Sequence, residues 1–230
     1  MDALKIGPEH LLVSEVFDSI QGEGPTTGRP STFLRLGLCN LRCAWCDTPY
    51  TWKWDEFSMS DELRAWSIDA VVERVAACSN LVITGGEPML QREALEALLQ
   101  RVECRVEVET AGTIAPGALA GRVQQWNVSP KLASSGNPLD KRFVPDALAE
   151  LMQLPGAVLK LVISANDLDE AHALIAKLGV EPPRVWLMPE GTDAETLRSA
   201  GAELAKVCVQ HGYNLSTRLH VLLWGDRRGV

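Results

Sequence analysis

Short apolar runs alternate along the chain with longer segments in which apolar residues recur at helical spacing. The runs are rich in valine, leucine and isoleucine and predict strands. They fall at residues 11–17, 32–36, 80–84, 105–110, 125–128, 158–164, 185–188 and 217–223. Strands that alternate with helices favour right-handed βαβ crossovers. The pattern therefore predicts an α/β fold with a mostly parallel sheet.

The intervening helices are marked by apolar spacing and by residues suited to helix ends. One follows Ser67, a residue type that caps helices, and the next carries leucines at positions 90, 95, 98 and 99. A third presents one apolar face that includes Leu197, Leu204 and Cys208, and it ends before Gly212. This spacing predicts that Cys208 lies in the core.

Polar and glycine-rich segments follow almost every predicted strand. They lie at residues 39–46, 84–88, 109–110, 129–131 and 188–191. Because the carboxyl ends of parallel strands share one edge, we expect these segments to meet on one rim. About six βα units are too few to close an eight-stranded barrel. We predict a partial (β/α)6-type TIM barrel, with the cysteine cluster and the substrate loops at its carboxyl rim.

Length, composition and net charge favour a single-domain globular protein that acts on a small molecule. The chain has 230 residues, of which 46% are hydrophobic, and it contains no repeat or long Pro/Gly/Ser linker, so we expect a single domain over 1–230. A net charge of -8 argues against nucleic acid as a partner and favours a small-molecule substrate. No apolar run reaches the roughly 20 residues of a membrane span, and the first ten residues do not resemble a signal peptide. We expect a cytoplasmic protein without a membrane partner.

Three of the six cysteines crowd into one short segment. Cys39, Cys43 and Cys46 form the pattern C-x-x-x-C-x-x-C. In a reducing compartment, such spacing suggests a soft metal centre rather than disulfides. A [4Fe-4S] cluster with three protein ligands would leave one iron open for a small molecule. Structural zinc, which normally takes four ligands, and a set of buried thiols are the alternatives, and the spacing favours iron–sulfur.

A second motif supports the iron–sulfur interpretation. The cysteine pattern together with the strand end Gly85-Gly86-Glu87-Pro88 resembles the radical S-adenosylmethionine (SAM) superfamily. The resemblance implies that the open iron chelates SAM and that the Gly-Gly-Glu-Pro segment meets the amino group of its methionine. Residues 1–230 would then form a single radical SAM core domain.

The amino-terminal third is more specific. Residues 14–25, 32–36 and 47–52, together with the cysteine cluster, resemble the 7-carboxy-7-deazaguanine synthase family, and the likeness continues through 109–113, 129–131 and 218–225. It implies a radical lyase of queuosine and 7-deazapurine biosynthesis. The substrate would be 6-carboxy-5,6,7,8-tetrahydropterin, which loses ammonia as its ring contracts to 7-carboxy-7-deazaguanine, and SAM would be regenerated.

The resemblance also implies roles for individual residues. The cluster ligands would be Cys39, Cys43 and Cys46. The residues that bind SAM would be Trp45, Cys46, Asp47, Gly86, Ser129, Pro130, Lys131, Met188, Pro189, Glu190 and Gly191. The substrate would be bound by Ile20, Gln21, Gly22, Arg35 and Thr84, and Mg2+ by Thr48. For Arg35 the alternative is a surface ion pair, and for Thr48 it is a helix cap.

Partners follow from the same resemblance. We expect a homodimer that receives electrons from a donor such as a flavodoxin or ferredoxin. Some family members contact the substrate with their extreme carboxyl terminus, but the tail at 225–230 differs and that contact is not carried over. The alternatives for function are a radical SAM activase of a partner protein and a non-catalytic zinc module.

Overall fold

The computed structural model describes residues 7–164 and 166–230. The fold is built around a single curved sheet. Within this part of the chain its strands are β1 (His10–Ile20), β2 (Pro30–Leu36), β3 (Arg64–Ser67), β4 (Asn80–Gly85), β5 (Arg105–Thr110), β6 (Gln125–Val128), β7 (Ala157–Ile163), β8 (Val185–Pro189) and β9 (Asn214–Leu215). Their order is β3-β1-β2-β4-β5-β6-β7-β8-β9. Neighbours from β2 to β9 are parallel, whereas β1 is antiparallel to β2 and β3. The sheet does not close, which confirms the predicted partial barrel.

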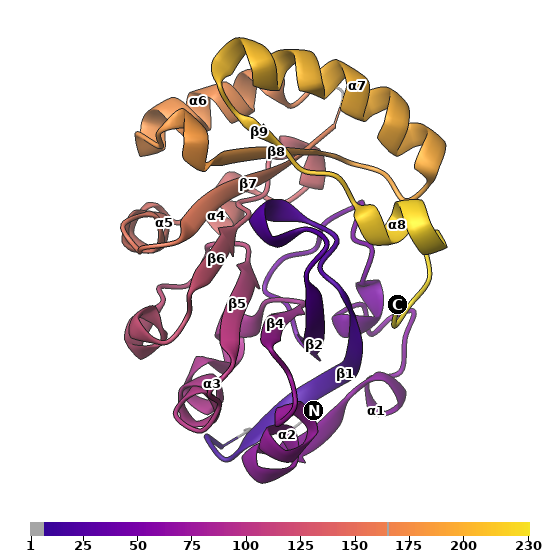
Figure 1. Ribbon diagram of the computed structural model, residues 1–230, viewed down its shortest axis with the longest axis vertical. Helices are drawn as coiled ribbons and strands as arrows, with labels where there is room; N and C mark the ends of the chain where they lie inside the picture. The colour runs from indigo at the N-terminus through magenta and orange to yellow at the C-terminus, as the bar shows by residue number, and fades with distance from the viewer. Residues whose placement is uncertain (1–6, 165) are drawn as a thin grey trace.

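Eight helices accompany the sheet in the described part of the chain. They are α1 (Met59–Glu62), α2 (Ile68–Val75), α3 (Arg92–Leu99), α4 (Leu139–Arg142), α5 (Pro145–Met152), α6 (Leu168–Leu178), α7 (Ala194–His211) and α8 (Leu219–Trp224). Short 3-10 turns lie at Gly24–Thr26, Pro49–Thr51, Pro88–Gln91, Gly117–Gly121, Ala133–Ser135 and Pro182–Arg184. Figure 1 shows α3, α5, α6 and α7 along the outer side of the strands. None of the helices in the described residues is long and apolar enough to cross a bilayer.

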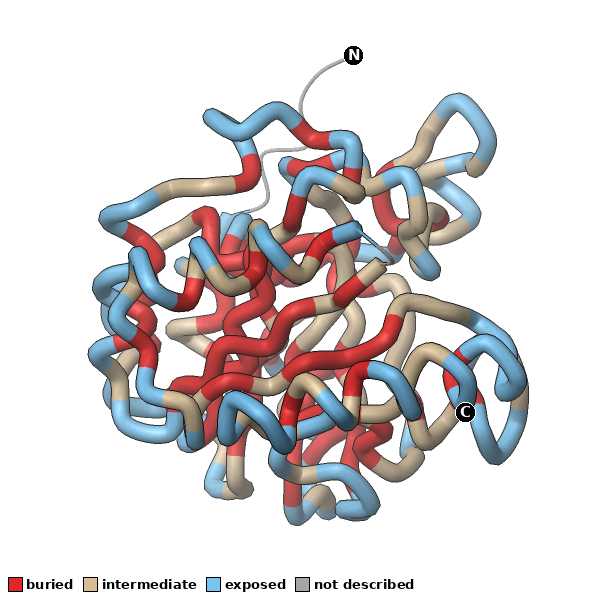
Figure 2. The backbone as a smooth tube through the Cα atoms, turned by 90° about the horizontal axis from the view of Figure 1, so that it is seen from above, coloured by how far each residue is buried: buried red, intermediate tan, exposed pale blue. Residues whose placement is uncertain are grey.

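Alternate residues of each central strand face different surroundings. In β5, Val106 and Val108 join the apolar core under the helices, while Glu107 and Glu109 lie on the opposite face. The two-residue period of a strand produces this division. Figure 2 shows the buried segments gathered in the strands, with exposed residues on the surrounding helices. The inner face of the sheet is therefore free to carry charged groups.

The predicted helix ends at Ser67 and Gly212 are confirmed, whereas Leu90, predicted to lie in the second helix, falls in the 3-10 turn before α3 and is exposed. The Ser67 hydroxyl accepts a hydrogen bond from the Ala70 amide at 3.2 Å and caps α2. Gly212 ends α7 with φ at 72°, a left-handed conformation that glycine adopts without steric cost. Cys208 is buried in the core, as the helical spacing predicted.

The predicted strand at 217–223 is wrong, because this segment forms α8. Leu222 and Leu223 are 42% and 54% exposed, whereas Val221 is buried, so the apolar run does not alternate between two faces of a sheet. The amides of Val221 and Leu222 both donate to the Arg218 carbonyl, at 3.0 and 3.1 Å. The helical turn brings Arg218 and His220 to the inner side of the barrel. Two short strands, β3 and β9, were not predicted, since runs of four and two residues carry little periodic signal.

Candidate active site

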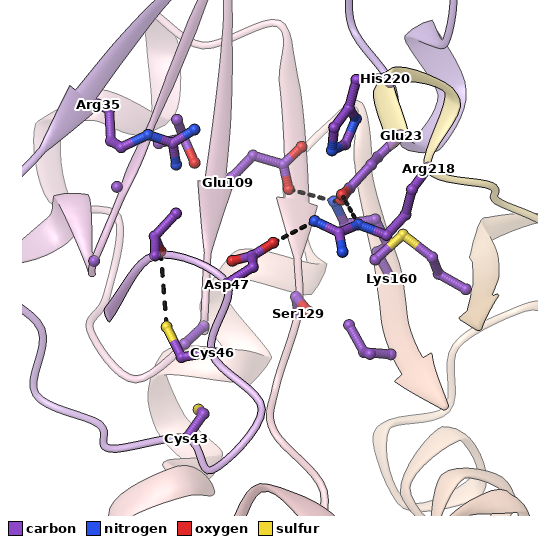
Figure 3. Close-up of a pocket in the computed structure, with 18 of the residues that line it drawn as sticks. Glu23, Arg35, Cys43, Cys46, Asp47, Glu109, Ser129, Lys160, Arg218 and His220 are labelled. Atoms are coloured by element: carbon purple, nitrogen blue, oxygen red, sulfur yellow. Dashed lines mark hydrogen bonds and ion pairs between the residues drawn. The ribbon is translucent and has the colours of Figure 1, made fainter. Parts of the chain in front are cut away.

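A pocket opens at the carboxyl ends of the parallel strands, on the inner side of the barrel. Its wall combines the loop after β1, the inner face of β2, the cysteine loop, the ends of β4, β5 and β8, and the start of α8. Figure 3 shows side chains from these separate segments pointing toward one another. The lining includes every residue predicted for the site except Pro130, which is buried between Ser129 and Lys131.

The cysteine loop begins at a constrained residue. Leu38 has φ at 72°, a left-handed conformation that is uncommon for a residue with a side chain. Its amide donates to the Thr51 carbonyl at 2.8 Å, and its own carbonyl accepts from the Glu87 amide at 2.8 Å. These two bonds fix the turn that sends Cys39 into the pocket.

All three cysteine sulfurs accept a hydrogen bond from a nitrogen. The donors are the Leu41 amide at 3.4 Å from Cys39, Asn137 Nδ2 at 3.3 Å from Cys43, and Trp52 Nε1 at 3.3 Å from Cys46. Such donors favour the thiolate that an iron–sulfur cluster requires, and they tune the cluster once it is bound. The donor set therefore fits a [4Fe-4S] cluster.

Burial disfavours the thiolate form of two of the cluster cysteines and so raises their pKa values. It raises the pKa of Cys39 to about 12, and it also raises the pKa of Cys43. Iron must therefore displace protons when it binds. Among residues 7–164 and 166–230, no three His, Cys, Asp or Glu side chains are grouped as ligands of one metal ion. That finding concerns a single ion, whereas a [4Fe-4S] cluster binds each cysteine at a different iron.

The Gly85-Gly86 turn at the end of β4 packs directly against the cysteine loop. A Cβ atom at Gly86 would lie 2.1 Å from the Leu38 carbonyl oxygen and 3.0 Å from Cys39 Cβ. The Gly86 amide donates to the Leu36 carbonyl at 3.0 Å, which holds the turn in place. Glycine is required here because the two backbones approach so closely.

Gly86→Ala is expected to lower Tm by about 5–10 °C and to reduce the iron bound after anaerobic reconstitution, because the added methyl group pushes Leu38 and Cys39 outward. Calorimetry and iron analysis measure the two effects. Gly121→Ala is the matched control, since a Cβ at Gly121 meets no atom within 4 Å. Equal iron content in the two variants would contradict this account.

A charged cluster occupies the wall opposite the cysteines. Lys160 is 3% exposed and donates to Glu23 Oε2 and to Glu109 Oε2, both at 2.6 Å. Arg218 donates to Glu23 Oε1 at 3.2 Å and also to Asp47. Figure 3 shows these five side chains joined in one chain of contacts. Two buried cations thus hold three carboxylates, of which Glu23 and Glu109 are half-buried and Asp47 is exposed.

The pKa directions follow from this arrangement. Burial alone would raise the pKa of Glu23, but Lys160 and Arg218 outweigh it and hold that pKa well below its usual range. Burial raises the pKa of Glu109 despite its contact with Lys160. Burial opposes the charge on Lys160, but the carboxylates of Glu109 and Glu23 raise its pKa. Burial also lowers the pKa of His220, which favours a neutral imidazole.

The segment predicted to bind substrate, residues 20–22, is held by hydrogen bonds to β5 and within its own loop. Gln21 Nε2 donates to Glu107 at 2.7 Å, and Gln21 Oε1 accepts from the Glu23 amide at 3.2 Å. Gly22 packs against the imidazole of His220, because a Cβ there would lie 2.0 Å from Nδ1. The backbone and side chains of this loop are therefore held before any ligand binds.

The contacts of Thr48 and Arg35 bear on the alternatives raised for these two residues. Thr48 precedes the 3-10 turn at Pro49–Thr51, but its hydroxyl caps nothing; it lies 3.7 Å from Cys46 Sγ and faces the pocket. Arg35 pairs with Glu15 through Nε at 2.9 Å, yet it lines the pocket and is not a surface residue. The pairing leaves its terminal nitrogens for other partners.

Two features of the pocket suit SAM. Within the described residues, the indole nitrogen of Trp45 is buried and has no partner, so a donor is left for a ligand. Lys131 lies 5.7 Å from the centre of the Trp45 ring and donates to the Ser129 hydroxyl at 3.0 Å. These side chains and the glycine turn at Gly86 fit a zwitterionic ligand beside the cysteine loop.

Sequence reasoning missed several residues of the charged wall. None of Glu23, Glu109, Lys160, Arg218 and His220 is among the residues predicted for the site. Glu109 and Lys160 interrupt apolar strands at positions that face the pocket, and that interruption is a signal that could have been used. Arg218 lay in the segment wrongly predicted as a strand.

The carboxyl-terminal tail also reaches the site. Val230 lines the pocket, although no contact was predicted for the tail. Arg228 holds the tail in place through ion pairs with Glu15 and Glu62, and its guanidinium carbon lies 3.8 Å from the centre of the Tyr50 ring. The tail is therefore tied to β1 and α1 beside the pocket.

Comparison with known proteins agrees with these features. A model of the Radical SAM superfamily matches residues 35–121, which contain the cysteine loop and the Gly-Gly-Glu-Pro turn. The 7-carboxy-7-deazaguanine synthase of Pyrobaculum aerophilum is 36% identical over 222 residues, covering 94% of this chain and 96% of that protein. The chain belongs to the 7-carboxy-7-deazaguanine synthase family. A second synthase, from Hyperthermus butylicus, is 38% identical over 229 residues, covering 93% and 92% of the two chains.

A solved structure with a similar fold supports the assignment to the 7-carboxy-7-deazaguanine synthase family. The crystal structure of QueE from Escherichia coli matches with a TM-score of 0.70 and 26% identity, covering 92% of this chain and 95% of that chain. Membership of the radical SAM superfamily implies a [4Fe-4S] cluster and SAM as cofactors. The chain is thus a radical SAM enzyme, and the activase and zinc alternatives lose their support.

Proposed function

We propose that this chain converts 6-carboxy-5,6,7,8-tetrahydropterin to 7-carboxy-7-deazaguanine with loss of ammonia, as part of queuosine and 7-deazapurine biosynthesis. Likeness to named synthases over nearly the whole chain supports the proposal. One observation in the structure carries it: the cysteine loop and a wall of paired carboxylates and cations line the same pocket. A radical source and a polar heterocycle can therefore meet there.

The cofactor side of the pocket is formed by the cysteine loop and its neighbours. Cys39, Cys43 and Cys46 would hold the cluster. SAM would lie against the residues predicted for it, which are Trp45, Cys46, Asp47, Gly86, Ser129, Lys131 and Met188, Pro189, Glu190 and Gly191, with Pro130 supporting them from behind. When bound, the cluster and SAM supply the carbon radical that removes a hydrogen atom from the substrate. The residues of this side would hold SAM in one orientation and exclude water.

The substrate side is formed by the loop after β1 and the inner faces of β2, β4 and β5. Ile20, Gln21, Gly22, Arg35 and Thr84 would contact the pterin, and all of them line the pocket. The planar guanidinium of Arg35 suits the substrate carboxylate. The amino group and ring N–H of a pterin are donors, and the carboxylates of Glu23 and Glu109 are acceptors suited to them.

The proposal extends to the surroundings of the site. Thr48 would bind Mg2+ together with substrate oxygens and waters, since its hydroxyl faces the pocket and a hard cation prefers oxygen ligands. We place the enzyme in the cytoplasm as a homodimer of single radical SAM core domains over residues 1–230, reduced by a flavodoxin or ferredoxin. Neither nucleic acid nor a membrane is a direct partner.

The test is anaerobic reconstitution followed by turnover with SAM, a reductant, Mg2+ and 6-carboxy-5,6,7,8-tetrahydropterin. Mass spectrometry should detect 7-carboxy-7-deazaguanine. Arg35→Gln should raise KM for the pterin at least about 10-fold, because a charge-assisted pair with the carboxylate is lost. Arg29→Gln, at an exposed arginine before β2, should leave KM unchanged. SAM cleavage without this product would retain the superfamily and refute the substrate.

A further inference from the structure

Arg218 stands where α8 begins and is 7% exposed. Its backbone is fixed, because its carbonyl accepts from the amides of Val221 and Leu222 at 3.0 and 3.1 Å. The side chain extends from this fixed point into the pocket wall, where Figure 3 shows it between Glu23 and Asp47. A buried arginine in a site needs a partner for each of its donors.

The guanidinium of Arg218 bonds to three separate segments. Nε donates to Glu23 Oε1 at 3.2 Å, Nη1 donates to the Gly191 carbonyl at 2.8 Å, and Nη2 donates to Asp47 Oδ2. The planar guanidinium of arginine carries its donors on three separate nitrogens in fixed directions, whereas the three donors of a lysine share one nitrogen. One side chain therefore fixes the relative positions of three loops.

These loops belong to opposite sides of the pocket. Asp47 directly follows the cluster cysteine Cys46, and Gly191 lies after β8; both were assigned to SAM. Glu23 directly follows the segment 20–22, which was assigned to the substrate. A displacement of either side is thus transmitted to the other through Arg218.

We propose that Arg218 is a positioning residue that couples SAM binding to pterin binding, by holding the cluster loop and the substrate loop in one arrangement. The inference rests on the proposed function, because it uses the ligands assigned there to each side. Coupling between two ligands is reciprocal, so each should tighten the binding of the other. Coupling would also restrict radical formation to the state in which the substrate is present.

The contacts of Arg218 predict which binding property changes when its side chain is removed. Glu23 would keep its bond to Lys160, so the substrate wall would retain its main cation. Asp47 would lose the ion pair that Arg218 provides. We therefore expect a loss of communication between the sides, with smaller changes in the affinity of each side alone.

The experiment compares Arg218→Gln and Arg218→Lys with Arg184→Gln. Arg184 bonds to the Ala157 and Met152 carbonyls at 2.9 and 2.7 Å and lies outside the pocket lining, so its loss reports the effect of removing a structural arginine. SAM affinity is measured by anaerobic calorimetry on the oxidised cluster, where no cleavage occurs, with and without 6-carboxy-5,6,7,8-tetrahydropterin. Hydrogen exchange on the cluster-free chain gives a readout that needs no activity.

In the wild type and in Arg184→Gln, the pterin should tighten SAM binding about 10-fold. Arg218→Gln should reduce this factor to about 1–2 and should raise the yield of 5′-deoxyadenosine per product. Its amides at 43–48 and 190–192 should exchange faster than in wild type and in Arg184→Gln. Arg218→Lys keeps the charge but cannot reach three segments, so its factor should stay well below that of wild type.

Several outcomes would overturn the inference. An unchanged coupling factor in Arg218→Gln would do so, and so would a wild type that makes product but shows no coupling. Full coupling in Arg218→Lys would show that charge suffices and would refute the role of the fork. A wild type that binds no pterin would instead contradict the proposed function, and the coupling would fall with it.

Discussion

The Cys43→Ala variant is expected to bind little iron and to lose product formation by more than about 100-fold. Loss of groups that merely support a metal ligand costs roughly 10–100-fold, so loss of the ligand itself should exceed that range. Cys43 lies in the pocket lining, where its sulfur accepts a hydrogen bond from Asn137. Iron and sulfide analysis, visible absorbance and product assay measure the outcome.

Cys104→Ala is the matched control for this prediction. Cys104 precedes β5 at the opposite end of the strand, packs against Cys78 and is not part of the pocket lining. It should bind iron and turn over like the wild type. If Cys43→Ala retained a full complement of iron, the assignment of the cluster to this loop would be wrong.

Lys160→Met is expected to reduce the free energy of unfolding by about 3–5 kcal/mol and Tm by roughly 6–15 °C. Removal of the cation leaves Glu109, whose side chain is 18% exposed, with hydrogen bonds from Asn127 at 2.8 Å and Gln21 at 3.4 Å but without its ion pair. Glu23 keeps only Arg218. Methionine fills the volume of the lysine but supplies no charge, so the two half-buried carboxylates lose the cation that offsets their desolvation.

The destabilisation should depend on pH in a defined direction. The folded-state pKa of Glu23 lies below its unfolded value, so its contribution is present above about pH 5 and is lost as pH falls. The folded-state pKa of Lys160 lies above its unfolded value, so its contribution is full below about pH 10 and is lost at higher pH. The difference in Tm between wild type and Lys160→Met should be largest between these limits and should shrink toward acid.

Lys206→Met is the control for the buried pair. Lys206 contacts Glu203 at 2.7 Å, but the two side chains are 72% and 74% exposed, so the pair should contribute less than about 1 kcal/mol. Calorimetry at about pH 3 and at about pH 7.5 compares the variants inside and below the pH window in which the Glu23 contribution is present. Similar Tm values for the two methionine variants would mean that the buried cluster does not stabilise the fold.

The sequence predicted the parts of the site that depend on local spacing. The cysteines at 39, 43 and 46 and the Gly85-Gly86 turn are contiguous motifs, and their placement at strand ends follows from parallel topology. Their position on one rim is confirmed by the sheet order and by the lining of the pocket. The individual roles of the site residues stay predictions.

The contacts that join distant segments could not be predicted. Arg218 and Asp47 are separated by 171 positions, and Arg228 and Glu15 by 213. No periodicity relates such residues, because their contact depends on how α8 and the tail pack. The apolar residues of 217–223 suited a strand as well as a helix, and tertiary packing decided between them.

The alternation along β5 and β7 also limits how the chain can change in length. Valines and leucines on one face meet the helices, while Glu107, Glu109 and Lys160 on the other face the interior of the barrel. One inserted or deleted residue would exchange the two faces, placing carboxylates under helices and aliphatic groups in the pocket. Viable insertions and deletions near β5 and β7 are therefore expected in the connections, and these two strands are expected to change by substitution.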